Sequence, residues 1–309
     1  MCDTHHSDTY YIGYIKKTKF LKPVTKKAYT RRLKTITDDI YTESLETILH
    51  NPVKFEKKLI KYCETTKNSS GNPLSLHTVG SYFTSVIALF MYNQQLKEDC
   101  FELFNKWKKI HEKYRKPIQN QYKSNEPTER QKEAYVSFED VCRAAQEQEI
   151  GSQERLLLMM YTEIPPLRSD FYKTKIYDTN PRKKSENYIV MSEDDNTAKL
   201  YLNKYKTSKR YGTIEALLPE KLVTEIRASL EAIPREYLFV SPRSKRPFDK
   251  ENTFNKWANR VLKRIFNDKF TLSMLRHIFI TRRDLQMESK SGLEQEKLAR
   301  QMGHSIEQQ

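Results

Sequence analysis

Residues 272–305 read LSMLRHIFITRRDLQMESKSGLEQEKLARQMGHS, and this stretch contains two helical patterns. Its first half has apolar residues at near-helical spacing, which predicts a helix with one buried face made of Leu272, Leu275, Phe279 and, more loosely, Ile280. Arg276 and His277 lie at the margin of that face. The helix should therefore hold the charge of Arg276 at a fixed place.

A second helical run, residues 293–302, ends at Gly303 and is followed at once by His304. Glycine readily adopts the left-handed conformation that ends many helices, so His304 should lie at a fixed corner after this helix. Each feature alone is more often structural, because arginine–histidine pairs beside apolar stripes and glycine caps are both common. The residues upstream decide whether Arg276 and His304 are structural residues or parts of a functional site.

The composition favours a polyanionic partner. The chain has 309 residues, enough for two domains, and a net charge of +15 with only 7 glycines, which argues against Gly-rich phosphate loops. Residues 1–125 hold 22 Lys and Arg against 12 Asp and Glu, which is two thirds of the net charge. The N-terminal part should therefore make the stronger electrostatic contacts.

A run of cations without any acid occupies residues 15–34. After Pro23 and Thr25 this run predicts a helix, and we expect DNA phosphate contacts from Lys16, Lys17, Lys19, Lys26, Lys27, Arg31 and Arg32. The alternative is a solvated charged face. A run of one sign is costly unless something neutralises it, which favours the first interpretation.

The chain divides into two predicted domains. Residues 1–115 should form a basic domain of four or five helices, in which Ser75 caps a helix with a long apolar stripe. Residues 116–134 are polar and contain two prolines, which predicts a linker. Residues 135–309 should form the second domain, so the predicted fold is mainly α with a small antiparallel β-sheet.

In the second domain, an apolar helical run over residues 156–161 is ended by Pro165 and Pro166, and Arg168 follows them. Three strand-like segments come next, at residues 188–191, 199–205 and 211–217. The last two are joined by the turn KTSKRYG, which predicts an antiparallel hairpin. Helices are then expected to begin at Pro219 and Asp249, with a short strand at residues 238–240 between them.

Four positions in these motifs resemble the active site of the tyrosine recombinases, the DNA strand-exchange enzymes that include phage integrases. Arg168 in PPLRSDF is similar to the family's first catalytic arginine, and Arg276 in SMLRH to the second. Lys206 in YKTSKRYG is similar to the lysine on the family's sheet turn, and His304 in MGHS to the late histidine. The resemblance covers residues 137–309, whereas residues 1–115 match the family's DNA-clamping domain only in size, charge and position.

The resemblance implies phosphoryl transfer at a DNA phosphodiester. Guanidinium forks bind two non-bridging oxygens and stay charged, so Arg168 and Arg276 are assigned to the scissile phosphate. Lys206 would protonate the departing 5′-hydroxyl as general acid. Lys209 in the same turn is assigned to DNA binding and is the alternative general acid. His304 would donate to a non-bridging oxygen.

Two departures from the family pattern matter. Where many members have a histidine three residues before the second arginine, this chain has Ser273, which donates a hydrogen bond but is a poor base. The family's nucleophilic tyrosine lies shortly after the late histidine, whereas the last tyrosine here is Tyr237. We expect the reading frame to continue past Gln309 into a helix with a tyrosine at about position 313, and the 309-residue form to cleave no DNA. His277 is expected to be structural.

The resemblance implies a site-specific recombinase or integrase that acts on double-stranded DNA, without metal or cofactor, as a homo-oligomer that is tetrameric in synapsis. The alternatives are a type IB topoisomerase-like enzyme, a non-catalytic DNA-binding protein with the same fold, and a basic helical protein with no role on DNA. The four cysteines form no CxxC pair, so we expect free thiols, no zinc site and an intracellular protein. No apolar run is long enough to span a membrane.

Overall fold

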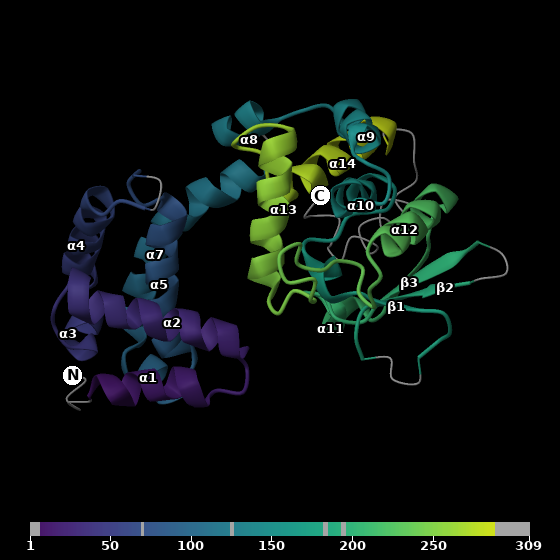
Figure 1. Cartoon of the computed structure of the whole chain (residues 1–309). Coiled ribbons are helices and arrows are strands. Elements are labelled where there is room, and N and C mark those ends of the chain that lie inside the picture. Colours follow the sequence, from purple (N-terminus) through teal and green to yellow (C-terminus); the bar gives the residue numbers. More distant parts are fainter. Residues whose placement is uncertain (1–6, 69–70, 124–126, 182–184, 193–195, 288–309) are drawn as a thin grey trace. The chain divides into compact units, whose positions relative to one another are not determined.

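The computed structural model describes residues 7–68, 71–123, 127–181, 185–192 and 196–287. The chain splits into two compact units, Met1–Glu126 and Pro127–Gln309, and each has its own buried hydrophobic core. The described residues are mainly helical with one small four-stranded sheet, which confirms the predicted fold class. Figure 1 labels the helices and strands of both units.

The regular elements in the described residues of the first unit are all helices, and they outnumber the four or five predicted. In chain order its elements are α1 (Asp8–Lys17), α2 (Pro23–Thr35), the π-helical turn η1 (Ile36–Ile40), α3 (Leu45–His50), α4 (Pro52–Thr65), α5 (Leu76–Met91), α6 (Gln94–Asp99) and α7 (Phe101–Lys123).

Helix α5 is the centre of this unit. As predicted, Ser75 caps it by accepting a hydrogen bond from the backbone N–H of Thr78. The apolar stripe of α5 packs against α7, where the indole Nε1 of the buried Trp107 donates to the carbonyl of Leu49 at 2.9 Å. That bond satisfies the polar atom of the largest buried side chain and ties α7 to the end of α3.

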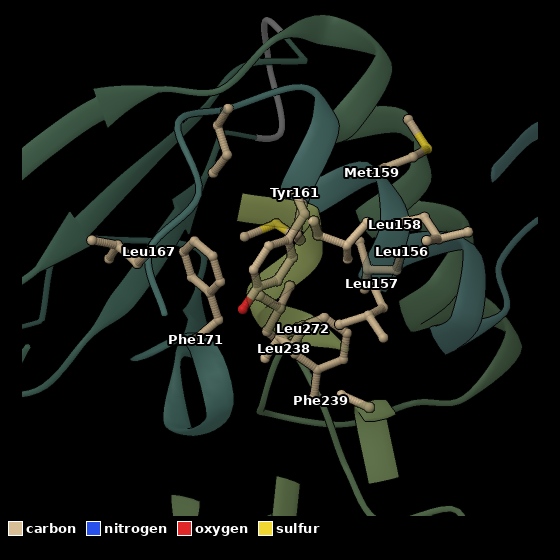
Figure 2. Packing of buried hydrophobic residues seen from close by; sticks show 14 of the residues in the cluster. Leu156, Leu157, Leu158, Met159, Tyr161, Leu167, Phe171, Leu238, Phe239 and Leu272 are labelled. Carbon is tan, nitrogen blue, oxygen red and sulfur yellow. The ribbon is translucent and has the colours of Figure 1, made fainter. Parts of the chain in front are cut away.

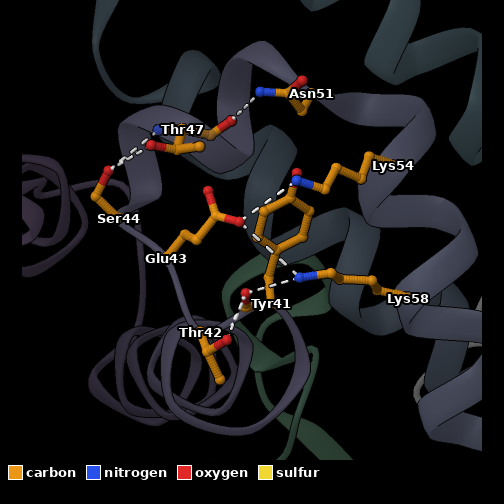
Figure 3. Close-up of polar contacts among 8 residues, drawn as sticks. All are labelled: Tyr41, Thr42, Glu43, Ser44, Thr47, Asn51, Lys54 and Lys58. Carbon is orange, nitrogen blue, oxygen red and sulfur yellow. Dashed lines mark hydrogen bonds and ion pairs between the residues drawn. The ribbon is translucent and has the colours of Figure 1, made fainter.

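Two lysines of α4 serve the structure of the first unit (Figure 3). Lys58 lies 4.1 Å from the ring centroid of the buried Tyr41 and donates to the Tyr41 carbonyl at 3.1 Å. Lys54 pairs with Glu43 at 3.5 Å, and this carboxylate, before any other cause, raises the pKa of Lys54. These cations are thus neutralised within the unit and are poor candidates for binding an external anion.

The predicted linker at residues 116–134 is mostly helical. Helix α7 continues through Pro117 to Lys123, and α8 (Glu129–Ala134) begins at a complete capping box between Thr128 and Gln131. The predicted linker therefore contains helices that its composition did not indicate, and the boundary between the two units falls inside it. Polar residues and prolines indicated a loop, but a long helix can carry a polar face and accommodate one proline near its end.

The second unit combines helices with the sheet. Its elements after α8 are α9 (Phe138–Glu147), α10 (Gln153–Thr162), the 3₁₀ turn η2 (Asp170–Lys173), β1 (Lys175–Tyr177), β2 (Tyr188–Met191), β3 (Ala198–Leu202), α11 (Ser208–Tyr211), β4 (Ile214–Leu217), α12 (Glu220–Ala232), α13 (Glu251–Ile265) and α14 (Leu272–Met287).

Helix α10 forms the core of this unit and packs against α9, α12 and α14. Every residue from Leu156 to Tyr161 is buried, so the helix has no solvent-facing side over this stretch. Figure 2 shows its leucines and Tyr161 among buried side chains from other elements, including Phe171, Phe239 and Leu272. A helix that is apolar all round must be central, and α10 fixes the positions of the loops at its two ends.

The sheet has the order β1-β2-β3-β4, and its first pair is parallel. β2, β3 and β4 are antiparallel neighbours as expected, but the parallel strand β1 was not predicted, so the sheet is mixed instead of antiparallel. β1 has only three residues and no fully buried side chain, which leaves no alternating pattern to recognise. The turn of the predicted hairpin also contains the short helix α11.

Within the part of the chain that the structure describes, no helix combines the length and apolar character needed to cross a bilayer. The expectation of free thiols holds for Cys63 and Cys142. It was wrong for Cys100, which is disulfide-bonded. Spacing along the sequence excluded a local CxxC pair but carried no information about distances in space.

Candidate functional site

Helix α10 holds the loop that carries Arg168 in place. Pro165 and Pro166 prevent the helix from continuing, and the buried Leu167 holds the loop on the core. The hydroxyl of the buried Tyr161 donates a hydrogen bond to the carbonyl oxygen of Arg168. The backbone of Arg168 is therefore fixed while its side chain is exposed.

Arg276 projects from α14, where Leu272, Leu275 and Phe279 of the predicted stripe are buried and Ile280 is half-buried. Ile278, which was not predicted, is buried as well. Burial, and then the positive charge of Arg168, lower the pKa of the Arg276 guanidinium to about 10. Arg276 thus stays charged near neutral pH. The effect also means that Arg168 and Arg276, which are far apart in the sequence, lie within electrostatic reach of each other.

Two carboxylates accompany these arginines. Burial, and then the charge of Glu251, raise the pKa of Asp170, whereas Arg168 and Arg276 act to lower it. The hydroxyl of the buried Ser169 donates to Glu251 at the start of α13, which connects α13 to the loop. The negative charges of these carboxylates reduce the electrostatic repulsion between the two guanidinium groups. The N–H donors of the arginines are kept.

Lys206 lies in the turn between β3 and β4 and is exposed, and Lys209 is exposed on α11 in the same connection. The turn is closed by Tyr205, whose ring is buried and whose hydroxyl donates to the carbonyl of Gly212 at 2.8 Å. Both candidate general acids are therefore presented to solvent on one short connection.

Asn187 connects the arginine loop to the lysine turn. Its side-chain nitrogen donates to the carbonyls of Asp170 at 2.9 Å and Lys204 at 2.8 Å. Its side-chain oxygen accepts from the backbone N–H of Asn203 at 2.9 Å and of Lys204 at 2.7 Å. One buried amide thus fixes the segment two residues after Arg168 to the residue two before Lys206.

The remaining predicted site residues are Ser273, His277 and His304. Ser273 is exposed in the first turn of α14, and His277 is exposed on the same helix. His304, with its expected helix at residues 293–302, lies outside the described residues. Among the described residues, no group of three His, Cys, Asp or Glu side chains is arranged to hold a metal ion.

A second candidate surface lies in the first unit, where cations from α1 and α2 line an open groove of about 400 Å³. Its lining residues are Lys16, Lys26, Lys27, Thr30, Arg31 and Lys34. Lys27, Arg31 and Lys34 follow the four- and three-residue spacing of one helix face, so their side chains point the same way. We call this set the basic groove.

The groove cations have few carboxylate partners. Among the described residues, only Asp38 lies within ion-pairing distance of one of them, at 4.0 Å from Lys34. Lys26 crosses to α1 and donates to the carbonyl of Lys16 at 2.8 Å, which holds the two helices together at the groove. An anion that enters the groove would therefore meet uncompensated positive charge.

The predicted DNA contacts divide between this groove and other places. Lys16, Lys26, Lys27 and Arg31 line the groove, whereas Lys17 and Lys19 are exposed beside it without lining it. Arg32 is half-buried on another face of α2, where its charge acts on Tyr29 and on Tyr82 of α5. The one-residue step from Arg31 to Arg32 rotates the side chain by about 100°, which the run of charges could not reveal.

Sequence reasoning missed four residues of the site in the second unit: Tyr161, Asp170, Asn187 and Glu251. Tyr161 belongs to an apolar run and Asn187 to a polar segment, so neither differs from its neighbours in type. Asp170 follows Arg168 closely and was the only one with a local signal. The role of each depends on partners that lie far away in the sequence.

Neither the models of known protein families nor the curated proteins gave a match to this chain. The resemblance to tyrosine recombinases therefore depends on the four matched positions in the sequence, of which Arg168, Lys206 and Arg276 lie in described residues.

Proposed function

We propose that this protein is a tyrosine recombinase that breaks and rejoins double-stranded DNA through a 3′-phosphotyrosyl intermediate. The observation that carries the proposal is the pair of Arg168 and Arg276, brought within electrostatic reach by separate elements of one core. Two planar guanidinium groups suit the two non-bridging oxygens of a phosphodiester, whose shared negative charge grows during attack. The hairpin that presents Lys206 is fixed to the same loop through Asn187.

In this mechanism, Arg168 and Arg276 bind the non-bridging oxygens and gain strength as negative charge develops there. Lys206, or Lys209 in its place, protonates the departing 5′-hydroxyl, and His304 donates to a phosphate oxygen. The attacking tyrosine is supplied by the segment expected after His304 in the sequence. The bond energy stays in the phosphotyrosine ester, so the family's cycle requires no metal, nucleotide or cofactor.

The partner is double-stranded DNA inside the cell. Exchange between two duplexes needs four cleavages, so the active assembly is a homo-oligomer, tetrameric in synapsis. The basic groove of the first unit supplies non-specific affinity through phosphate contacts, because among its cations only Lys34 has a carboxylate, Asp38, within ion-pairing distance in the described residues.

Covalent trapping tests the proposal. Duplexes selected by this protein from a random library, and nicked near the cleavage position, let the freed strand diffuse away and preserve the adduct. A form that extends past Gln309 through the expected tyrosine should become attached to DNA, and replacing that tyrosine with phenylalanine should abolish attachment. Relaxation of supercoiled DNA without recombinant joints would indicate a topoisomerase-like enzyme, and absence of any adduct would indicate a non-catalytic DNA-binding protein.

In that extended form, Arg168→Ala and Arg276→Ala should each lower the rate of adduct formation by at least ~100-fold, as expected for a lost donor to developing charge. The dissociation constant for the same duplex should change only a few-fold. Arg276→Lys should not restore the rate, because an ammonium cannot form the two-pronged contact. Arg260→Ala, which removes one exposed charge from α13, is the matched control. Equal losses in binding and rate would make these arginines ordinary phosphate contacts.

A further inference from the structure

Phe20 is the most solvent-exposed large hydrophobic side chain in the described part of the chain, at 89%. It lies in the connection between α1 and α2, and Val24 in the first turn of α2 is 80% exposed. Burial of a phenylalanine side chain removes a large apolar surface from water and so stabilises a folded protein, a gain that the exposed Phe20 does not provide. Single exposed apolar residues are common, and the meaning of Phe20 depends on its surroundings.

The connection that exposes Phe20 is well anchored. Leu21, the next residue, packs against the core of the first unit. The backbone N–H of Phe20 donates to the hydroxyl of Thr18 at 3.3 Å, and the N–H of Thr18 ends α1 by donating to Tyr14 at 3.0 Å. With Leu21 directed inward, the adjacent Phe20 is held outward.

The surroundings of Phe20 are cationic. Lys19 and Lys22 flank it and are exposed, and the ends of α1 and α2 on either side contribute Lys16 and Lys26 to the basic groove. Residues 15–34 contain no carboxylate at all. A partner for this surface must therefore be polyanionic and must also offer an apolar face to an aromatic ring.

Double-stranded DNA meets both requirements, because its phosphates are spaced along a backbone and its base pairs present flat π-faces once a step is opened. Apolar wedges inserted at a base step are used by proteins that grip DNA mainly through its backbone. Stacking of one aromatic side chain on a base adds measurably to affinity and tolerates any base, because every base has a π-face.

We propose that Phe20 inserts into the base stack of DNA held by the basic groove, with Val24 covering the edge of the opened step. The inference rests on the proposed function, since it takes duplex DNA as the ligand of the first unit. It adds a sequence-tolerant stacking contact to the phosphate contacts. A wedge of this kind favours steps that unstack easily, such as TA and CA/TG.

Phe20→Ala tests the contact by affinity. The full chain is titrated against a short duplex that contains TA steps at several salt concentrations. Loss of the ring should weaken binding about tenfold while the slope of log Kd against log [salt] stays unchanged, because no cation is removed. Lys27→Ala should change both affinity and slope, and Phe101→Ala, which removes an exposed ring on α7, should change neither.

Phe20→Trp gives a direct readout, because the native Trp107 and Trp257 are buried and contribute a constant background. The new indole should bind DNA as tightly as phenylalanine, and its emission should be quenched and protected from acrylamide on DNA binding. Unchanged emission, or wild-type affinity of Phe20→Ala, would overturn the wedge while leaving the proposed function intact.

A further measurement tests whether the surface around Phe20 binds a membrane instead of DNA. Quenching or a blue shift of the Phe20→Trp emission on vesicles that contain anionic phosphatidylserine, without any response to duplex DNA, would show a membrane surface and overturn the inference. Absence of duplex binding by the wild-type chain would overturn the wedge and the proposed function together. Circular dichroism of each variant checks that the helices remain folded, as expected for substitutions at an exposed position.

Discussion

At the scale of single residues, Asn187 is the most fully used polar side chain of the candidate site. A primary amide offers two donors and an acceptor with two lone pairs, and all four are engaged in the structure. Three of the partner groups belong to Asn203 and Lys204, and the fourth is the carbonyl of Asp170. Asn187 therefore acts as a positioning residue for the loop and turn that carry Arg168 and Lys206.

Asn187→Asp should destabilise the second unit by about 2–3 kcal/mol, because the carbonyls of Asp170 and Lys204 lose their donor and face a carboxylate. Urea unfolding measures the loss, and hydrogen exchange should become faster in residues 203–213. Asn203→Asp is the matched control, since Asn203 makes similar contacts at a more exposed position. If both variants lost the same stability, the special role of Asn187 would be refuted.

At the scale of elements, the connection from α9 to α10 sets the position of the core helix. Gly151 there has a φ of +81°, and a Cβ at this position would lie 2.8 Å from the carbonyl oxygen of Ala228 on α12. The N–H of Gly151 donates to the buried Glu225 at 2.9 Å, and Glu225 also pairs with Arg155 at 2.8 Å. The turn, α10 and α12 are thereby joined through one carboxylate.

Gly151→Ala should destabilise the second unit by about 2 kcal/mol or more, because the backbone conformation and the contact with α12 both disfavour a Cβ. Gly13→Ala is the control, because it should raise the free energy of unfolding instead of lowering it. Gly13 lies within α1 with no atom near its missing Cβ, so alanine should stabilise the first unit by about 0.5–1 kcal/mol. Thermal unfolding of the full chain, followed with a probe for each unit, distinguishes the two changes. A neutral Gly151→Ala would contradict the packing described for this turn.

At the scale of the whole molecule, the two units divide the proposed work. The first has the larger share of the net charge and the basic groove, and the second has the arginine pair and the hairpin lysines. Each unit has its own core, so each should fold separately. DNA affinity and DNA chemistry should therefore be separable by cutting the chain between them.

Fragments 1–126 and 127–309 should differ in DNA binding. The first should bind duplex DNA more tightly and with the steeper dependence on salt, because its uncompensated cations displace more counterions. Titrations of each fragment and of the full chain at several salt concentrations measure both quantities. Lys57→Ala, which removes an exposed charge on α4 away from the groove, should weaken the first fragment less than Lys27→Ala. Equally tight and equally salt-sensitive binding by fragment 127–309 would contradict this division.

The sequence by itself determined the features that depend on local pattern. Apolar periodicity predicted α5, α10 and α14, the prolines before Arg168 predicted the end of α10, and alternation with turn residues predicted β2 and the strands after it. These features follow from side-chain spacing and backbone preference within a few residues, which are properties of the chain alone. The four positions that resemble a recombinase site were also readable, because each lies in a short motif.

Only the tertiary structure decided how those positions relate in space. The proximity of Arg168 to Arg276, the link through Asn187 and the partners of Asp170 and Glu251 all join residues from separate elements. The same holds for the short parallel strand β1, for the face of α2 that lines the basic groove and for the exposure of Phe20 beside Leu21. A sequence pattern records which side of an element is apolar, but packing chooses which distant groups that element meets, because burial of the whole core fixes the positions of its helices and loops together.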